Sequence, residues 1–338
     1  CAEALRRKNE VREPVKTVYF GGGTPSRLDN QAFAEIFETL FSHFPIEEDA
    51  EITLEANPDD LSEEYIHLLR KLPFNRISIG IQSFDDGELK FLSRRHSARQ
   101  AIQAVKLCRQ AGFENISIDL MYGLPGQTPG MWEKSLRQAC ELDVWHISAY
   151  HLIYEKQTRL YALLQKGSVR PVTDEASTEM FSMLIDTLAQ NGFEHYEISN
   201  FAKSKKYSIH NTSYWKNEKY IGLGPSAHSY DGENRSWNIA SLEKYITAIQ
   251  SGELLQETEK LTFTQKYNEF ILTGLRTMWG VDLNLLKEKF GQELFDYCLQ
   301  NARKFIREGF LVSKDNSLIM NRKGIFISDG IMSELMRV

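Results

Sequence analysis

Residues 76–121 read RISIGIQSFDDGELKFLSRRHSARQAIQAVKLCRQAGFENISIDLM, and this stretch decides the fold class. It opens with a short β-branched run at 76–81, which predicts a strand. A helical pattern follows at 98–111 and ends at Gly112, and a second strand-like run occupies 115–121. Strand, helix and strand in that order form a βαβ unit, whose two strands are parallel.

The same alternation of predicted strands and helices continues on both sides of this stretch. Further strands are predicted at 16–20, 51–56 and 146–153, and helices at 30–43, 62–72 and 131–142. Repeated βα units of about 30 residues predict an α/β fold with a parallel sheet. Because every strand reads as continuously apolar, helices are expected on both faces. A (β/α) barrel and an open doubly wound sheet both fit this pattern.

Composition and charge exclude several classes of protein. The 338 residues include 40 basic and 46 acidic side chains, a net charge of −6, which does not favour a nucleic-acid partner. No apolar run approaches the roughly 18 residues of a membrane span, and the polar start at 1–14 predicts no signal peptide. We therefore expect a cytoplasmic protein whose contact with a membrane is at most peripheral.

The second half of the chain follows another pattern. A helix is predicted at about 173–191, followed by an irregular, aromatic-rich segment at 196–237. Helices are then expected at 242–250, 264–278, 283–290 and 292–308, before two strand-like runs around Lys314-Asp315-Asn316, a hairpin signal. Helices followed by a hairpin are typical of a winged-helix arrangement, which we interpret as structural because no basic recognition stripe accompanies it.

Candidate ligand-binding residues lie at the carboxyl ends of the predicted strands, where α/β folds form their sites. The first strand ends in Gly21-Gly22-Gly23-Thr24, which lets a ligand approach bare backbone. Glu55, Gln82 and Asp119 stand at or near three successive strand ends. An acid in an apolar strand is costly unless it is paired or bound to something. Together these residues offer partners for ribose hydroxyls or an amino group.

Two other groups are ambiguous from the residues alone. Arg94 and Arg95 follow the third strand, where an arginine can pair with a ligand carboxylate, although a solvated basic face is the simpler interpretation. His210, Tyr214 and Trp215 combine an imidazole, a usual axial ligand of haem iron, with two aromatic rings that can pack on a porphyrin. The same aromatic residues would equally suit a domain interface.

Several of these motifs occur together, in order, in one known family. The segments are GGGTPS at 21–26, LEANPDD at 54–60, RISIGIQSFDD at 76–86, LSRRHS at 92–97 and IDLMYGLPGQT at 118–128. They resemble the radical S-adenosylmethionine enzymes of the oxygen-independent coproporphyrinogen III oxidase group, and the match covers nearly the whole chain. HNTSYW at 210–215 and GLGPSAHSY at 222–230 resemble the haem-chaperone branch of that group more than the oxidases.

The resemblance implies an incomplete (β/α) barrel of the radical S-adenosylmethionine type with a smaller, mostly helical, winged-helix-like C-terminal domain. It implies a barrel over 1–200 without its first strand and cluster loop, a connecting segment over 201–240 with the HNxxYW motif, and a helical domain over 241–338 ending in a β-hairpin. The implied S-adenosylmethionine-binding residues are Gly22, Gly23, Thr24, Glu55, Gln82, Arg94 and Asp119. Arg94 is preferred to Arg95 by its register against His96. The implied haem-binding residues are His210, Tyr214 and Trp215.

One family feature is missing from this sequence. The family holds a 4Fe–4S cluster on a C-x-x-x-C-x-x-C loop, whereas Cys1, Cys108, Cys140 and Cys298 are far apart. No metal ligands are therefore expected in this chain, and we expect the cluster loop of the full-length protein to precede Cys1.

The resemblance implies a haem chaperone that binds haem as cargo and delivers it to respiratory haem proteins, on a scaffold for S-adenosylmethionine and the cluster. The alternative within the group is an oxygen-independent coproporphyrinogen III oxidase, a radical dehydrogenase of porphyrin biosynthesis. A third hypothesis, a winged-helix binding module on a degenerate barrel, is disfavoured by the charge balance.

Overall fold

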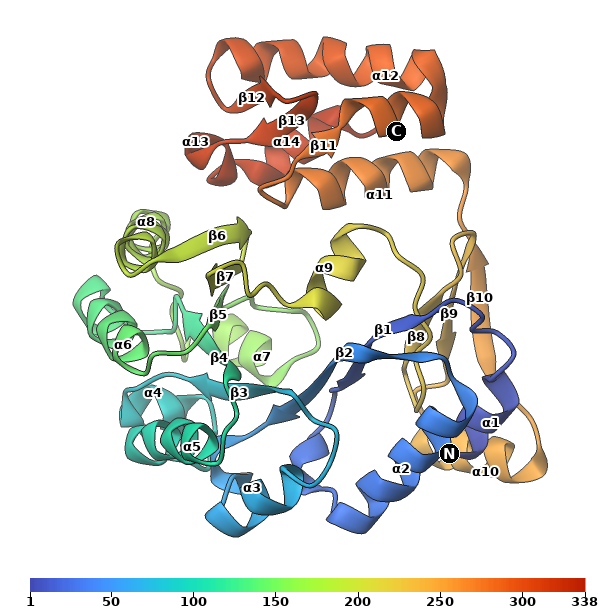
Figure 1. The fold of residues 1–338 in the computed structure, drawn as a ribbon. Coiled ribbons are helices and arrows are strands. Elements are labelled where there is room, and N and C mark those ends of the chain that lie inside the picture. Colours follow the sequence, from blue (N-terminus) through green and yellow to red (C-terminus); the bar gives the residue numbers. More distant parts are fainter. Residues whose placement is uncertain (338) are drawn as a thin grey trace. The chain divides into compact units, whose positions relative to one another are not determined.

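The computed structural model describes residues 1–337 and contains a seven-stranded sheet (Figure 1). Its strands are β1 (Val15–Phe20), β2 (Ile46–Ala56), β3 (Arg76–Gln82), β4 (Asn115–Tyr122), β5 (His146–His151), β6 (Phe193–Glu197) and β7 (Asn200–Lys203). They lie in the order β1-β2-β3-β4-β5-β7-β6. β2 to β5 pair in parallel, as the βαβ pattern predicts, while β7 joins β5 and β6 antiparallel.

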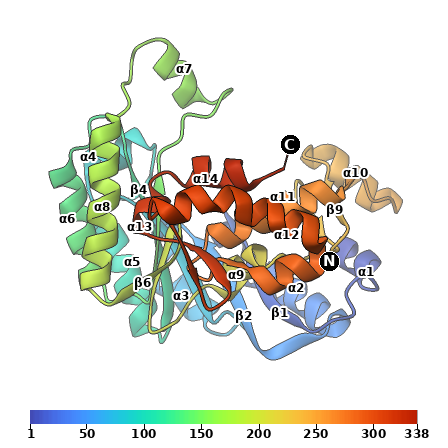
Figure 2. The same ribbon diagram turned by 90° about the horizontal axis from the view of Figure 1, so that it is seen from above.

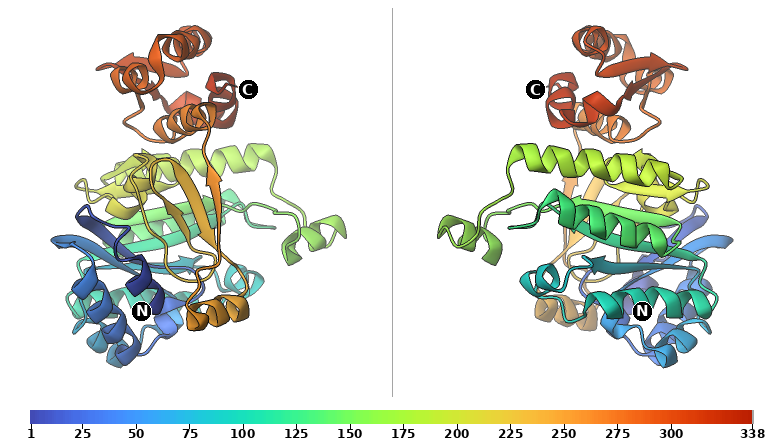
Figure 3. Two further views of the ribbon diagram at one scale, coloured as in Figure 1. Left: turned by 90° about the vertical axis from the view of Figure 1, so that its right-hand side faces the viewer. Right: turned by 90° about the vertical axis from the view of Figure 1, so that its left-hand side faces the viewer.

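Helices connect these strands, and most begin where a polar side chain caps them. They are α2 (Asn30–His43), α3 (Glu63–Leu69), α4 (Asp86–Phe91), α5 (Ala98–Gln110), α6 (Pro129–Glu141), α7 (Arg159–Gln165) and α8 (Asp174–Gln190). Ser62 accepts a hydrogen bond at the start of α3, as predicted, and Ser97 and Gln100 form a capping box at the start of α5. α5 packs against β3 and β4, and α6 packs against α8 (Figure 3).

The two faces of the sheet differ in polarity, and the prediction of continuously apolar strands is wrong. Ile77, Ile79 and Ile81 of β3 are fully buried, while Ser78 and Gln82 alternate with them. β4 repeats the alternation, with Asp119 on the polar side. Serine, glycine and a single acid alternate with the isoleucines in these strands, and the high content of β-branched residues hid this period of two. This polar face carries most of the candidate ligand groups.

The described chain forms two compact units. One contains 17–34 and 51–208, and hence most of the large sheet; the other contains 1–16, 35–50 and 209–338. The predicted three-part domain division stays a prediction. The segment predicted to be irregular, 196–237, contains several short strands and one short helix. These elements are too short to give a periodic signal in the sequence.

The second unit holds the remaining elements. They are α1 (Ala2–Arg7), α9 (Ile209–Trp215), β8 (His228–Tyr230), β9 (Asn234–Asn238), α10 (Leu242–Ser251), β10 (Gln256–Lys260), α11 (Phe263–Leu275), β11 (Val281–Asp282), α12 (Leu283–Arg307), β12 (Leu311–Lys314), β13 (Ser317–Met320), α13 (Arg322–Ile325) and α14 (Ser328–Leu335). Gly291, with φ 78° and ψ 177°, interrupts α12 between the two predicted helices.

The predicted hairpin is present as β12 and β13, but α13 and α14 follow it, so the chain does not end in that hairpin. None of the helices in residues 1–337 is both long and apolar enough to cross a membrane.

Candidate functional site

Glu55 lies near the end of β2 and organises the glycine run that follows β1. Its carboxylate accepts a hydrogen bond from the Tyr19 hydroxyl at 2.6 Å and from the Gly22 amide at 3.1 Å. Gly22 adopts φ 74° and Gly23 φ 60°, which favour glycine. A Cβ on Gly21 would lie 2.5 Å from the Tyr19 ring and 3.0 Å from the Glu55 carboxyl. The glycines therefore allow backbone and carboxylate to meet at this strand end.

Asp119 lies two strands further along, on the polar face of β4. Its carboxylate accepts from the Ser78 hydroxyl of β3 at 3.3 Å, and its register partner on β5 is Ser148. Burial raises the pKa of Asp119 to about 6; hydrogen bonds from Ser148 and Ser78 oppose that shift, and the charge of Glu55 adds to it. A carboxyl kept in so costly a place is typical of a ligand-binding position.

Arg94 reaches back across the ends of β2 and β3. Its Nη2 donates to Asn57 Oδ1 at 2.6 Å and to the Gly80 carbonyl at 2.7 Å. A Cβ on Gly80 would lie 3.1 Å from Gln82 Nε2 and 3.3 Å from Arg94 Nη2, so these two side chains converge over that glycine. Burial lowers the pKa of Arg94, but the guanidinium remains a cation near neutral pH.

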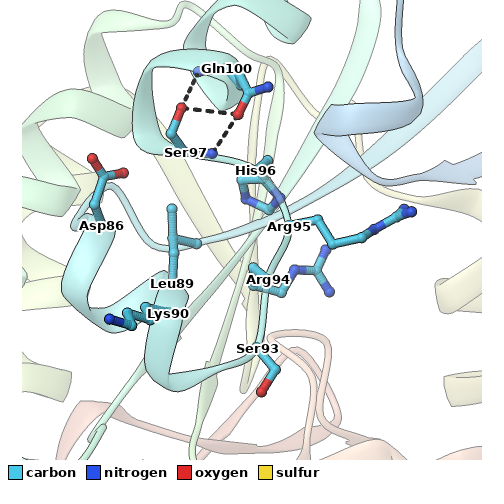
Figure 4. Close-up of a pocket in the computed structure, with 9 residues that line it drawn as sticks. All are labelled: Asp86, Leu89, Lys90, Ser93, Arg94, Arg95, His96, Ser97 and Gln100. Carbon is cyan, nitrogen blue, oxygen red and sulfur yellow. Dashed lines mark hydrogen bonds between the residues drawn. The ribbon is translucent and has the colours of Figure 1, made fainter.

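Arg95 points elsewhere and is exposed. It forms ion pairs with Asp59 at 2.6 Å and Asp60 at 3.3 Å. Figure 4 shows Arg94, Arg95 and His96 along an open hollow of about 350 Å³ between α4 and α5. The residues that line this hollow include Arg94 but neither Glu55 nor Asp119. Of the two arginines, therefore, Arg94 lies beside Gln82, and Arg95 does not.

Sequence reasoning missed Tyr150 at the end of β5. Tyr150 is 42% exposed. Burial of the hydroxyl and the negative charges of Asp119, Glu197 and Glu55 raise its pKa, while a hydrogen bond from Ser148 acts in the opposite direction. The signal was present, because Tyr150 follows Ser148 by two residues and therefore shares the polar face.

The assembled groups combine backbone amides, carboxylates, an amide side chain and one guanidinium. Carboxylates suit hydroxyl groups and a positively charged centre, and a guanidinium suits a carboxylate. A ligand that joins a nucleoside to an amino acid offers all three, so the residues fit S-adenosylmethionine. They do not fit an iron–sulfur cluster. Within residues 1–337 no three His, Cys, Asp or Glu side chains gather to hold a metal ion, and Cys108 and Cys298 are buried singly.

The second candidate group lies on α9, which is a helix and not the irregular segment predicted. His210 and Tyr214 are one turn apart, with ring centroids 5.0 Å apart in an edge-to-face arrangement. Tyr214 is 38% exposed and also meets Tyr220 at 4.8 Å. Trp215 follows Tyr214 by one residue and lies on another side of the helix, where the Arg276 guanidinium is 4.9 Å from its ring centre. The structure therefore brings together His210 and Tyr214 but not Trp215.

Comparison with known proteins assigns the chain to a family. A family model of the radical SAM superfamily matches residues 1–139, and one of the HemN C-terminal domain matches 261–327. The protein named heme chaperone HemW of Bacillus subtilis (strain 168) is 34% identical over 319 residues, covering 94% of this chain and 84% of that protein. The chain belongs to the HemW family. A mitochondrial relative of this HemW-family chain, radical S-adenosyl methionine domain-containing protein 1 of Bos taurus, is 32% identical over 348 residues, covering 99% and 78%.

A solved structure confirms the predicted fold class for this HemW-family chain. Coproporphyrinogen III oxidase (HemN) from Escherichia coli matches with a TM-score of 0.84 and 21% identity, covering 99% of this chain and 81% of that one. The fold is an incomplete (β/α) barrel of the radical SAM type with a mostly helical C-terminal region. At this identity the likeness concerns the fold and not the reaction.

Proposed function

We propose that this HemW-family protein binds haem and inserts it into respiratory haem proteins, acting in the cytoplasm. The observation that carries the proposal is the His210–Tyr214 pair on an exposed side of α9. An imidazole supplies an axial ligand to haem iron, and a tyrosine ring one turn away supplies a flat apolar surface. A chaperone must also release its cargo, so an exposed site with a single protein ligand suits this function better than a buried one.

We propose further that the polar face of the sheet binds S-adenosylmethionine, which supplies the starting point for radical chemistry when bound. Glu55 and Asp119 are placed to bind its hydroxyl and amino groups, and Arg94 with Gln82 its carboxylate. Gly22 lies beside Glu55, and Gly23 and Thr24 follow it with further backbone groups for the ligand. The family implies a 4Fe–4S cluster as well, for which residues 1–337 supply no ligand set.

A titration with haem, followed by absorbance, tests the chaperone proposal. His210→Ala should shift the Soret band and speed haem loss, because the iron–nitrogen bond is removed while apolar contact with the ring remains. His228→Ala is the matched control, since His228 is exposed on β8 and stacks on Trp237 at a centroid distance of 5.8 Å.

Two results would contradict the haem assignment. If His228→Ala abolishes binding and His210→Ala does not, the ligand is misassigned. If the unchanged protein binds no haem, the chaperone proposal fails, and anaerobic consumption of coproporphyrinogen then tests the oxidase alternative.

Isothermal calorimetry with S-adenosylmethionine tests the second proposal. Glu55→Ala or Asp119→Ala should weaken binding by about 1–3 kcal/mol, because a ligand group loses its hydrogen-bonding partner. Glu114→Ala, an exposed acid just before β4, is the control and should leave the affinity unchanged. Unchanged affinity in both test variants would give Glu55 and Asp119 structural roles.

A further inference from the structure

Residues 153–172, which we call the arm, leave the sheet between β5 and α8 and carry α7. Figures 2 and 3 show α7 projecting beyond α6 and α8. None of the seven residues of α7 is buried, and its three leucines, Leu160, Leu163 and Leu164, are partly exposed. Ile153, at the root of the arm, is 71% exposed. The arm therefore presents apolar side chains without the core contacts that ordinarily hold a short helix in place.

The side chains of α7 divide into two faces. At 100° per residue, Leu160, Leu163 and Leu164 share one side of the helix, and Tyr161 lies at its edge. Arg159 and Lys166 lie at the other edge of the leucine stripe. An apolar stripe flanked by cations, whose aliphatic stems run along the apolar surface towards the headgroups, is typical of helices that lie flat in a membrane interface. Tyrosine is enriched at that depth because its ring is apolar and its hydroxyl is polar.

The charge of the arm is opposite to that of the whole chain. It carries Lys156, Arg159, Lys166 and Arg170 against a single acid, Glu155, in a protein of net charge −6. In the part of the chain that the structure describes, none of these four cations forms an ion pair. Four unpaired cations on one projecting segment form a concentrated positive patch, which attracts an anionic surface.

We propose that the arm binds the surface of an anionic phospholipid membrane, with α7 lying parallel to it. The leucines of α7 and Ile153 would enter the headgroup boundary, and the lysines and arginines would contact lipid phosphates. A lipid surface accounts for the cations and for the unburied leucines together, whereas an acidic protein surface accounts for the cations alone. This inference is independent of haem and of S-adenosylmethionine.

Co-sedimentation of the whole chain with lipid vesicles tests the proposal. The protein should pellet with vesicles that contain phosphatidylglycerol and stay in solution with pure phosphatidylcholine, and salt should weaken the binding. Each basic residue near an anionic surface contributes about fivefold to partition. Reversing two of them in Arg159→Glu/Arg170→Glu should therefore reduce binding at least tenfold. Leu160→Ser/Leu164→Ser should reduce it without changing the charge.

Arg99→Glu/Lys106→Glu is the matched control. Both residues are exposed on α5, and the double change alters the net charge by the same amount as the arm variant. It should keep most of the binding. An equal loss in this control would show that net charge alone drives adsorption and would overturn the proposal.

Protection from trypsin gives a second measurement, because three basic residues of the arm, Lys156, Arg159 and Lys166, are cleavage sites, whereas Pro171 blocks cleavage after Arg170. Anionic vesicles should protect these bonds, and neutral vesicles should not. Failure of the unchanged protein to pellet with anionic vesicles would also overturn the proposal. Equal unfolding curves for all variants, recorded by circular dichroism, ensure that any loss of binding is not a loss of folding.

Discussion

The polar face of the sheet and the exposed side of α9 hold their candidate ligand groups in opposite ways. Glu55 extends from a paired strand and is held by Tyr19 and Gly22, and Asp119 is held by Ser78 in the same manner. His210 stands on a seven-residue helix, beside a tyrosine that is 38% exposed. The first arrangement is rigid and half-buried; the second is open.

This difference corresponds to two tasks. A cofactor that takes part in chemistry needs groups held within a fraction of an ångström, which strands and their hydrogen-bonded neighbours provide. A haem that is bound as cargo must be released again, so its site has to open without unfolding the hydrophobic core of the protein. Under the proposed function, the same chain uses half-buried carboxylates for one ligand and exposed aromatic residues for the other, and each of the following substitutions tests that contrast.

The largest expected effect is on stability, and it distinguishes two tryptophans, Trp132 and Trp215. Trp132 is fully buried, stacks on Tyr122 at 5.3 Å and donates its indole N–H to the Met180 carbonyl at 3.0 Å. Trp132→Ala should lower the free energy of unfolding by about 3–5 kcal/mol. Trp215→Ala should cost less than half as much, because Trp215 is only partly buried and its indole N–H has no hydrogen-bond partner. Urea unfolding followed by far-ultraviolet circular dichroism measures both. Similar losses would make Trp215 a core residue and remove it from the haem site.

Asp119→Asn should stabilise the ligand-free protein while weakening S-adenosylmethionine binding. Burial raises the pKa of Asp119 from 3.8 to about 6, so the folded state holds a proton that the unfolded state has already lost. The contribution of Asp119 to stability is therefore present below about pH 4 and is lost as the pH rises to about 6 and above. Asparagine removes this titration and keeps an acceptor for the Ser78 hydroxyl.

The expected gain from Asp119→Asn is about 1–3 kcal/mol at pH 7–8 and close to zero below pH 4, after allowance for solvent screening of a half-buried group. Denaturant unfolding at several pH values measures it. A variant that is less stable than the unchanged protein at pH 8 would show that the ionised carboxylate is a structural partner. Gain in stability with loss of affinity is the pattern expected of a binding residue.

Much of the sheet site could be predicted from the sequence, because the βα rhythm identifies strand ends and parallel strands bring their ends together. Helix 30–43 was predicted with its observed bounds, and Glu55, Gln82 and Asp119 lie at the predicted edge. The glycine run was also predicted to be functional, and its contact with Glu55 is visible only in the structure.

The features of the fold and of the sites that could not be predicted depend on contacts between residues that are distant in sequence. β6 and β7 are short, and the antiparallel pairing of β7 with β5 and with β6 leaves no periodic signal. α9 is also short, and its sequence, with three polar residues between His210 and Tyr214, resembles a loop. Tyr150 was missed because the strand was interpreted as uniformly apolar, which concealed the face it shares with Ser148.

Arg94 and Arg95 give a smaller contrast within the sheet site itself. Arg94→Ala should weaken S-adenosylmethionine binding by on the order of 1.5 kcal/mol, because a charged group that bridges Asn57 and Gly80 is removed. Arg95→Ala should change the affinity by less than about 0.5 kcal/mol, since its exposed ion pairs with Asp59 and Asp60 lie outside the converging groups. Calorimetry of the two variants decides between them. A larger loss of affinity in Arg95→Ala than in Arg94→Ala would show that Arg95, and not Arg94, contacts the ligand.

The smallest expected effect concerns the cation that covers Trp215. The Arg276 guanidinium lies 4.9 Å from the centre of the Trp215 ring, a contact that contributes about 0.5–1 kcal/mol at a partly exposed site. Arg276→Met keeps the aliphatic stem and removes the charge, so loss of the contact with Trp215 should lower the free energy of unfolding by about that amount, as measured by urea unfolding. Haem affinity should not change if His210 and Tyr214 form the binding surface, because Trp215 lies on another side of α9. Lys216→Met is the matched control, since Lys216 lies 5.9 Å from the ring centre of Trp279. A clear loss of haem affinity in Arg276→Met alone would show that the haem-binding surface includes Trp215. The site on α9 would then be less open, and less different from the sheet site, than proposed.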